Sequence, residues 1–193
     1  MQEQDPIDYG PLAGLIGTWK GNKGKDKSPE ADGSTELNDY FETLVFIEAG
    51  ETSNAEEQTL SAVQYTQLVQ RSSTGKIIHR EVGYWLWEQG TENVINSLTI
   101  PRGLSVLAGG KAITKRSTVF EVEARLNCPN WPITESAFLQ TKASTKSLQK
   151  KMTLSGDKLQ YSQHMILDIY GNEFNHNDHH RLMREVLITD NLS

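Results

Sequence analysis

The stretch LQYSQHMILDIYG, residues 159–171, carries the pattern that decides the fold. Every second residue is apolar, with one interruption at Gln163: Leu159, Tyr161, Met165, Leu167 and Ile169. The opposite face carries polar side chains: Gln160, Ser162, His164 and Asp168. A period of two residues is typical of a β-strand with one buried and one solvent-facing side. This stretch therefore predicts a strand of an antiparallel sheet.

The same alternation recurs along most of the chain, at residues 39–48, 59–71, 76–88, 93–100, 104–108, 117–126, 135–143 and 147–154. Turn sequences separate these segments: EAGE, SSTGK, EQGTE, AGGK and LSGDK. Many short strands at hairpin spacing, without a long helical pattern, predict one antiparallel up-and-down β-barrel of about ten strands. The architecture expected is that of lipocalins and fatty-acid-binding proteins. Such a barrel encloses space for one small ligand.

The predicted barrel domain covers residues 12–187, between an N-terminal tail, 1–11, and a C-terminal tail, 188–193. One short helix is expected in GPLAGLIGTW (10–19), where it would plug one end of the barrel. Trp19 at its end is expected to pack across that closed end. The polar stretch 21–39 is predicted to be a long loop, and NCPNWPI (127–133) to interrupt a strand pair.

Composition narrows the classes of partner. The net charge is −6 and no Lys/Arg-rich face stands out, which argues against nucleic acid, because phosphate neutralisation needs clustered cations. No apolar run reaches about 18 residues, so no membrane span is expected. A single cysteine, Cys128, and a polar, acidic N-terminus indicate a cytoplasmic protein. We expect a monomer or homodimer that binds a small molecule.

The segment YGNEFNHNDHHRLMRE, residues 170–185, holds three of the five histidines within five positions. Strand alternation places His176, Asp178 and His180 on one side and His179 on the other. A Zn²⁺ or Ni²⁺ site from the first three is chemically reasonable, but alternate residues of one strand rarely converge on a tetrahedral ion. A solvated turn is the plainer alternative for these histidines.

Four segments in collinear order resemble one protein family: LAGLIGTWKGNKG (12–24), GKIIHREVGYWLW (75–87), SLTIPRGLSVLAGG (97–110) and GDKLQYSQHMILDIYGNEFNHNDHHRLMRE (156–185). They are similar to the opening Gly-x-Trp-x-Gly motif, the His-x-Glu-x-Gly strand, the following strand pair and the closing hairpin of nitrobindin-like haem-binding β-barrels. The Pro-Arg-Gly form of the third segment is that of a bacterial branch. The resemblance implies the barrel fold and a haem b cofactor.

Carried over residue by residue, the resemblance makes His176 the axial ligand of the haem iron, with His180 as the alternative ligand. Met165, His79 and Ile78 match positions that line the pocket. A distal side lined by Ile78 and Met165 lacks a hydrogen-bond donor, so it would suit nitric oxide or a ferric reaction better than oxygen storage. The implied activity is isomerisation of peroxynitrite to nitrate, with no catalytic residue beyond the haem ligand.

A second function from another class is a non-catalytic carrier of a fatty acid or other small apolar ligand. It predicts inward-facing arginine or tyrosine side chains that grip a carboxylate, and a colourless protein. Plainer roles also exist for the single residues: core packing for Met165, and a structural role for His79. Arg102 is expected to bond backbone carbonyls in its turn rather than a ligand carboxylate.

Overall fold

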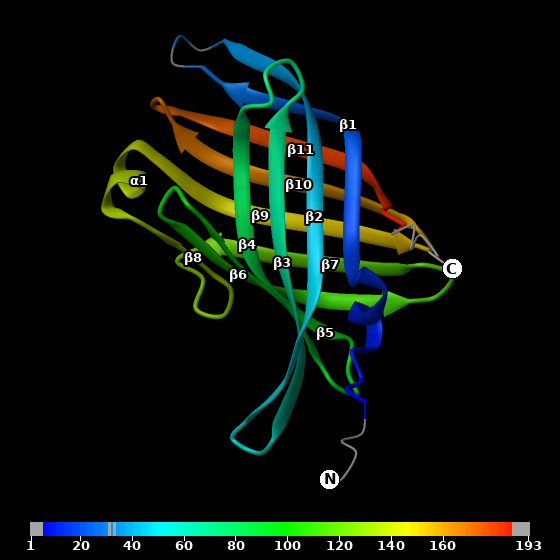
Figure 1. The fold of residues 1–193 in the computed structure, drawn as a ribbon. Coiled ribbons are helices and arrows are strands. Elements are labelled where there is room, and N and C mark those ends of the chain that lie inside the picture. The colour runs from blue at the N-terminus through cyan, green and yellow to red at the C-terminus, as the bar shows by residue number, and fades with distance from the viewer. Residues whose placement is uncertain (1–5, 31, 33, 187–193) are drawn as a thin grey trace.

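The computed structural model describes residues 6–30, 32 and 34–186. In this part of the chain, eleven strands close into a barrel in the order β1-β11-β10-β9-β7-β8-β6-β5-β4-β3-β2 (Figure 1). The strands are β1 (Gly17–Pro29), β2 (Thr35–Asn54), β3 (Gln58–Arg71), β4 (Ile77–Glu88), β5 (Asn93–Ile100), β6 (Leu104–Thr114), β7 (Thr118–Leu126), β8 (Pro132–Glu135), β9 (Ala143–Ser155), β10 (Lys158–Ile169) and β11 (Asn172–Arg184). The predicted β-barrel is confirmed. The predicted tail 188–193 and residues 1–5 lie outside the described residues.

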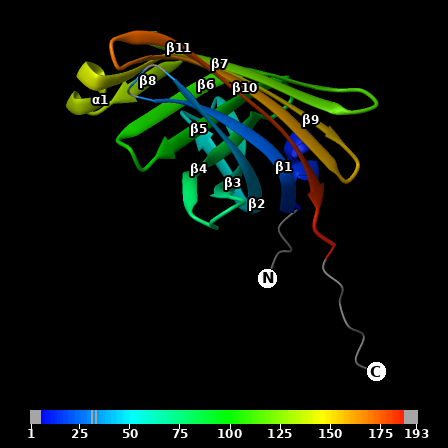
Figure 2. The same ribbon diagram turned by 90° about the horizontal axis from the view of Figure 1, so that it is seen from above.

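The barrel has two opposite walls. Seen from above, β2, β3 and β4 form one wall, and β9, β10 and β11 form the wall opposite (Figure 2). Neighbouring strands in each wall are antiparallel and mostly in hairpin order, as the alternation predicts. None of the helices that the structure describes is long and apolar enough to cross a membrane.

The prediction of a purely up-and-down barrel is wrong at one place. The short strand β8 lies between β6 and β7, antiparallel to β6 and parallel to β7. A helix, α1 (Ala137–Lys142), follows it inside the predicted strand 135–143. The Ser136 hydroxyl accepts a hydrogen bond from the backbone N–H of Leu139 at 3.4 Å, which caps the helix start. This local cap outweighs the weak alternation of the segment.

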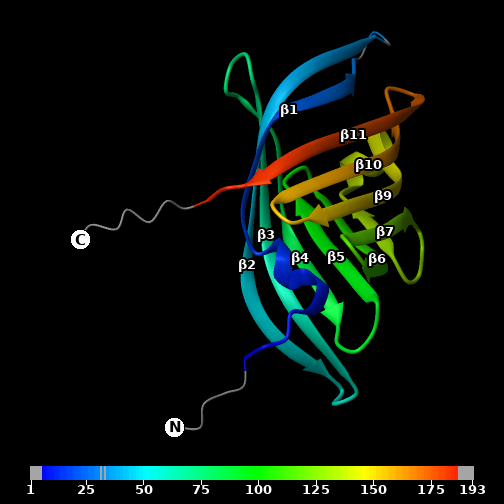
Figure 3. The ribbon, with the colours of Figure 1, turned by 90° about the vertical axis from the view of Figure 1, so that its right-hand side faces the viewer.

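The prediction that residues 21–39 form a long loop is also wrong in part. β1 and β2 remain paired from Gly17↔Phe46 to Pro29↔Thr35, with a register shift between Gly21 and Gly24. β1 pairs with β11 only at Trp19 and Lys20. Beyond Trp19 and Lys20, β1 and β2 form a two-stranded arm, drawn in blue at the top of Figure 3. The β1 half of this arm, GNKGKDKSP, contains no alternating apolar residues, which is why the sequence pattern missed it.

The AGGK segment, expected as a turn, lies inside β6 instead. A side chain at Gly109 would collide with the ring of Trp131, only 2.1 Å from its Cβ position. A side chain at Gly110 would meet the backbone carbonyl of Glu121 at 1.9 Å. These glycines therefore permit close approach of neighbouring segments rather than a reversal of the chain.

The predicted plug is confirmed as a 3-10 helix, η1 (Gly10–Leu15), which lies at the base of the barrel in Figure 3. Leu12 and Leu15 are fully buried, as is Trp19, whose indole N–H donates to the Leu15 carbonyl at 2.7 Å. The guanidinium of Arg184 lies 4.2 Å from the Trp19 ring centroid and donates to the carbonyls of Gly14 and Ile16. These bonds satisfy free carbonyls of the plug and close this end.

Candidate functional site

Exposure along the inward face of β11 shows which end of the barrel is accessible. Leu182 and His180, nearest the plug, are buried, whereas Asp178, His176 and Phe174 are half-buried. We call the end far from the plug the open end. It contains the inward side chains whose exposure allows contact with a ligand.

His176 lies at this open end, on the inward side that alternation predicts. Its Cα partner on β10 is Met165, which is buried, and its ring lies 6.3 Å from that of Phe174 in an edge-on arrangement. The Met165 sulfur is 3.3 Å from the Nε2 of Gln163. The imidazole therefore lies on the inward side, next to a strand neighbour and an aromatic ring that are both apolar.

His180 lies deeper, inside a network of buried polar side chains. Its Nδ1 is 2.6 Å from Glu42 Oε2, and its Nε2 accepts from the backbone N–H of Lys23 at 3.3 Å. Tyr161 donates to the same Glu42 carboxylate at 2.9 Å. The side chain of His180 is only 1% exposed. Both ring nitrogens are engaged, so the structure argues against His180 as the alternative iron ligand.

Asp178 lies between these two histidines and belongs to the same network. One of its carboxylate oxygens accepts from Tyr40 at 2.6 Å and the other lies 3.2 Å from the Tyr161 hydroxyl. Burial, and the nearby carboxylates of Glu42 and Asp178, raise the pKa of Tyr161 well above its usual value. The tyrosines therefore act as neutral donors. Among the described residues, no group of three histidine, cysteine or acidic side chains is arranged to hold a metal ion.

A second polar cluster crosses the interior between β4 and β9. Lys150 Nζ lies 3.2 Å from Glu81 Oε1, and the side chains of this ion pair are 5% and 2% exposed. Tyr65 donates a short hydrogen bond to the same carboxylate oxygen, and Asn96 donates to the Tyr65 hydroxyl at 3.2 Å. The Glu81 carboxylate thus occupies the position next to the buried ammonium of Lys150.

The charge of Glu81 makes stability depend on pH. Burial alone would raise its pKa, but the ammonium of Lys150 and the hydrogen bonds from His79 and Tyr65 lower the pKa to about 2. Because the pKa of Glu81 is depressed in the folded state, its ionised carboxylate stabilises the fold fully above pH 4.5, the ordinary pKa value. This stabilisation is lost as the pH falls toward 2. We therefore expect the free energy of unfolding to drop by roughly 3 kcal/mol more in the wild type than in Glu81→Gln over this range. Urea denaturation at pH 6 and pH 2.5 measures the free energy of unfolding of both proteins. If the wild type and Glu81→Gln lose the same free energy between these pH values, Glu81 does not have this role.

The structure places the other predicted pocket residues in different surroundings. His79 shares the inward face of β4 with Glu81, and its Nε2 is 3.5 Å from Glu81 Oε2, so it has a structural partner at the edge of the interior. Ile78 is half-buried at the register shift between β3 and β4. Its carbonyl accepts from Arg102 at 3.4 Å, in line with the backbone role expected for that arginine. His164 bonds Asn175, and His179 is exposed on the outward side of β11.

Sequence reasoning missed the buried polar residues of the barrel interior. Glu42, Gln67, Glu81 and Lys150 all occupy inward positions of strands whose other inward residues are mainly apolar or aromatic. A charged residue that interrupts the apolar phase of a strand is a signal that could have identified them. Their partners could not be read from sequence, because they come from strands far apart in the chain.

The family model of the THAP4-like, heme-binding beta-barrel domain matches residues 8–184. The chain belongs to this family. The match covers every described strand and agrees with the family resemblance of the four sequence motifs. A search among curated proteins found no significant match.

The crystal structure of Rv2717c from M. tuberculosis is similar in fold. The TM-score is 0.70 at 24% sequence identity, over 93% of this chain and 100% of that chain. This similarity supports the barrel architecture. The ligand class comes from the THAP4-like family, whose domain is haem-binding.

The residues of the open end fit a haem better than those of the deep interior. At the depth of His180, the hydrogen-bonded side chains of Glu42, Gln67 and Tyr161 fill the space between the walls. Nearer the opening, His176 supplies an imidazole, and Met165, Leu167 and Phe174 supply apolar surface. An imidazole and apolar side chains, the kinds of group that hold a haem, therefore lie together at the opening.

Proposed function

We propose that this THAP4-like domain binds haem b at the open end of the barrel, with His176 as the axial ligand, and that the complex reacts with nitric oxide or peroxynitrite. The observation that carries the proposal is the position of His176: inward-facing, half-buried and flanked by Met165 and Phe174. When bound, haem would supply an iron coordination position at which nitric oxide binds or peroxynitrite isomerises to nitrate.

The protein's own contribution is binding, orientation and exclusion of water. His176 would set the position of the iron, while Met165, Phe174 and Leu167 would contact the apolar macrocycle. The buried network around His180 limits how deep a ligand can enter. Met165 lies beside His176 on the neighbouring strand, so it would add apolar contact on the side of the axial ligand and would not line the opposite side, where nitric oxide would bind.

The fatty-acid carrier is the less favoured function. Its carboxylate would need a free cationic or tyrosine grip inside the barrel, but Tyr40 and Tyr161 contact Asp178, and Tyr65 and Lys150 contact Glu81. The carboxylate of a bound fatty acid would lie near three carboxylates of the protein, those of Glu42, Asp178 and Glu81, and would be repelled by them. The interior is therefore better suited to a ligand bound near the opening.

The test is a titration of the purified apoprotein with hemin. We expect a saturable Soret band with one haem per chain, a shift of that band on addition of nitric oxide, and faster decay of peroxynitrite in stopped-flow measurements with nitrate as product. A wild-type protein that stays colourless with excess hemin would refute the haem proposal. A haem complex that leaves the rate of peroxynitrite decay unchanged would refute only the proposed chemistry.

A further inference from the structure

We propose that the open end of the barrel docks on the surface of a bilayer that contains anionic phospholipid. The docking surface consists of three segments, residues 76–80, 101–103 and 136–142, which we call the basic rim. They contain the start of β4, the turn between β5 and β6, and the helix α1 with its cap. Because consecutive strands alternate in direction, these segments and the β10–β11 turn lie at the end far from the plug, where Figure 1 shows α1 and that turn.

Contacts between the three segments make the basic rim one continuous surface. The guanidinium of Arg102 donates to the Ile78 carbonyl at 3.4 Å, which joins the β5–β6 turn to β4. The backbone N–H of Ser136 donates to the Gly103 carbonyl at 2.8 Å, which joins the same turn to α1. The turn therefore connects two segments that are far apart in the chain.

The basic rim carries four cations and no acidic residue, although the whole chain has 25 acidic and only 19 basic residues. These cations are all exposed, and within the described part of the chain none of them belongs to an ion pair: Lys76, Arg80, Arg102 and Lys142. They come from separate turns, so the sequence shows no basic cluster. The folded chain therefore has a local positive surface on an acidic protein.

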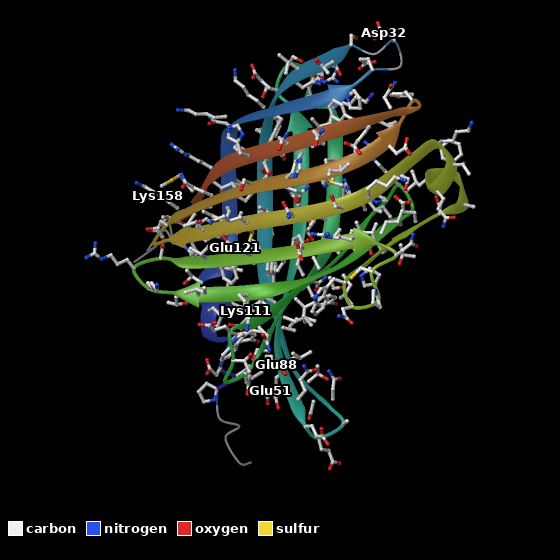
Figure 4. The ribbon with its side chains drawn as sticks, turned by 180° about the vertical axis from the view of Figure 1, so that it is seen from behind. Asp32, Glu51, Glu88, Lys111, Glu121 and Lys158 are labelled. Carbon is white, nitrogen blue, oxygen red and sulfur yellow. The ribbon has the colours of Figure 1, made fainter. Side chains whose placement is uncertain are left out.

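Acidic side chains lie on other parts of the molecule. Figure 4 shows Glu51 and Glu88 at the plug end, Glu121 on the side wall and Asp32 at the tip of the β1–β2 arm, all apart from α1. A negatively charged bilayer repels such carboxylates and attracts the basic rim. The charge distribution therefore orients the barrel with its open end toward the lipid.

Large apolar side chains are exposed beside these cations. Phe138 is 69% exposed and Ile77 is 44% exposed. Phe138 and Lys142 are four positions apart in α1, which places them on the same side of the helix, and Ile77 directly follows Lys76. At an anionic bilayer an apolar side chain enters the boundary between headgroups and acyl chains, while a neighbouring cation stays near the phosphates.

An aromatic residue of the β10–β11 turn extends this surface. Tyr170 is 54% exposed and follows Ile169, whose Cα partner is Ala143 at the end of α1. Tyrosine is enriched at the headgroup level of bilayers, where its ring is apolar and its hydroxyl reaches water. A fluid lipid surface fits this arrangement better than a folded protein does, because the apolar residues stand on separate turns with cations between them.

Docking in this orientation would turn the opening, where His176 lies, toward the bilayer. An apolar ligand would then pass between the lipid and the barrel without crossing water. The docking itself depends on neither haem nor the proposed function. The protein without haem therefore tests it separately.

The test is flotation of the haem-free full chain with lipid vesicles at low ionic strength. We expect the wild type to float with phosphatidylcholine vesicles that contain about 30% phosphatidylserine, and to stay behind with phosphatidylcholine alone. Salt at about 0.5 M should release it, because the attraction is screened. A wild type that does not float with the anionic vesicles, or that floats equally with both kinds, would overturn the proposal.

Two double variants with the same change in charge locate the docking surface. Lys76→Gln/Lys142→Gln is expected to lower the partition coefficient by about tenfold or more, since each cation near an anionic surface contributes about fivefold. Lys115→Gln/Lys158→Gln removes two exposed cations at the plug end and should bind as the wild type does. Equal partition coefficients for the two double variants would show that the basic rim does not dock.

A second pair of variants tests the apolar contribution. Phe138→Ser should lower the partition coefficient by about fivefold, whereas Ile113→Ser, which removes a 43% exposed side chain near the plug end, should leave it unchanged. If Phe138→Ser binds the anionic vesicles as tightly as Ile113→Ser does, Phe138 does not enter the lipid. Far-ultraviolet circular dichroism of each variant verifies that the barrel is folded.

Discussion

Replacing His176 with alanine is expected to reduce hemin affinity by about 100-fold or more, since loss of a residue that only supports a metal ligand already costs 10- to 100-fold. The imidazole lies on the inward face of β11, next to Met165 of the neighbouring strand and to the ring of Phe174. The measurement is a hemin titration followed at the Soret band, with circular dichroism to show that the variant remains folded.

Two matched variants sharpen this prediction. His179→Ala removes the exposed histidine on the outward side of the same strand and should leave hemin affinity unchanged. His176→Gly leaves space for a free imidazole, so added imidazole should restore part of the Soret absorbance. If His176→Ala and His179→Ala bind hemin equally well, His176 is not the ligand.

The second large effect concerns stability. Lys150→Met removes the ammonium but keeps the length of the side chain, and it leaves the Glu81 carboxylate buried without its cation. Breaking a buried ion pair from one side typically costs about 3–5 kcal/mol, because an uncompensated charge remains in the interior. We expect a loss of this size in the free energy of unfolding, measured by urea denaturation at pH 7.

The neighbouring Lys151 provides the control. It pairs with Glu121 on the surface, where both side chains are more than half exposed, so Lys151→Met should cost less than about 1 kcal/mol. The double variant Glu81→Gln/Lys150→Met removes both charges and keeps an acceptor for Tyr65, so it should recover much of the lost stability. If Lys150→Met and Lys151→Met lower the free energy of unfolding equally, the buried Lys150–Glu81 pair contributes no more to stability than the surface pair.

Much of the fold was predictable because strand alternation is a local property. The sequence pattern identified the strand at 159–171, the plug at 10–19 and the side of β11 that His176 shares with Asp178 and His180. It failed where another local signal took over, or where a paired strand lacks apolar alternation. The helix capped by Ser136 and the polar arm of β1 and β2 are these cases.

The candidate site was only partly predictable. Which face of β11 turns inward followed from the period of two, but the different fates of His176 and His180 did not. Glu42 contacts His180 although 138 positions separate them, and Lys150 contacts Glu81 across 69 positions. No periodicity within one segment contains such information.

The sequence alone therefore determined the class of fold, the phase of most of the strands and the family. Tertiary structure decided how far each inward side chain lies from the opening and which carboxylates meet which donors. The physical reason is that burial of alternate residues is set by the strand itself, whereas depth and pairing depend on how the closed barrel staggers strands that are distant in the chain.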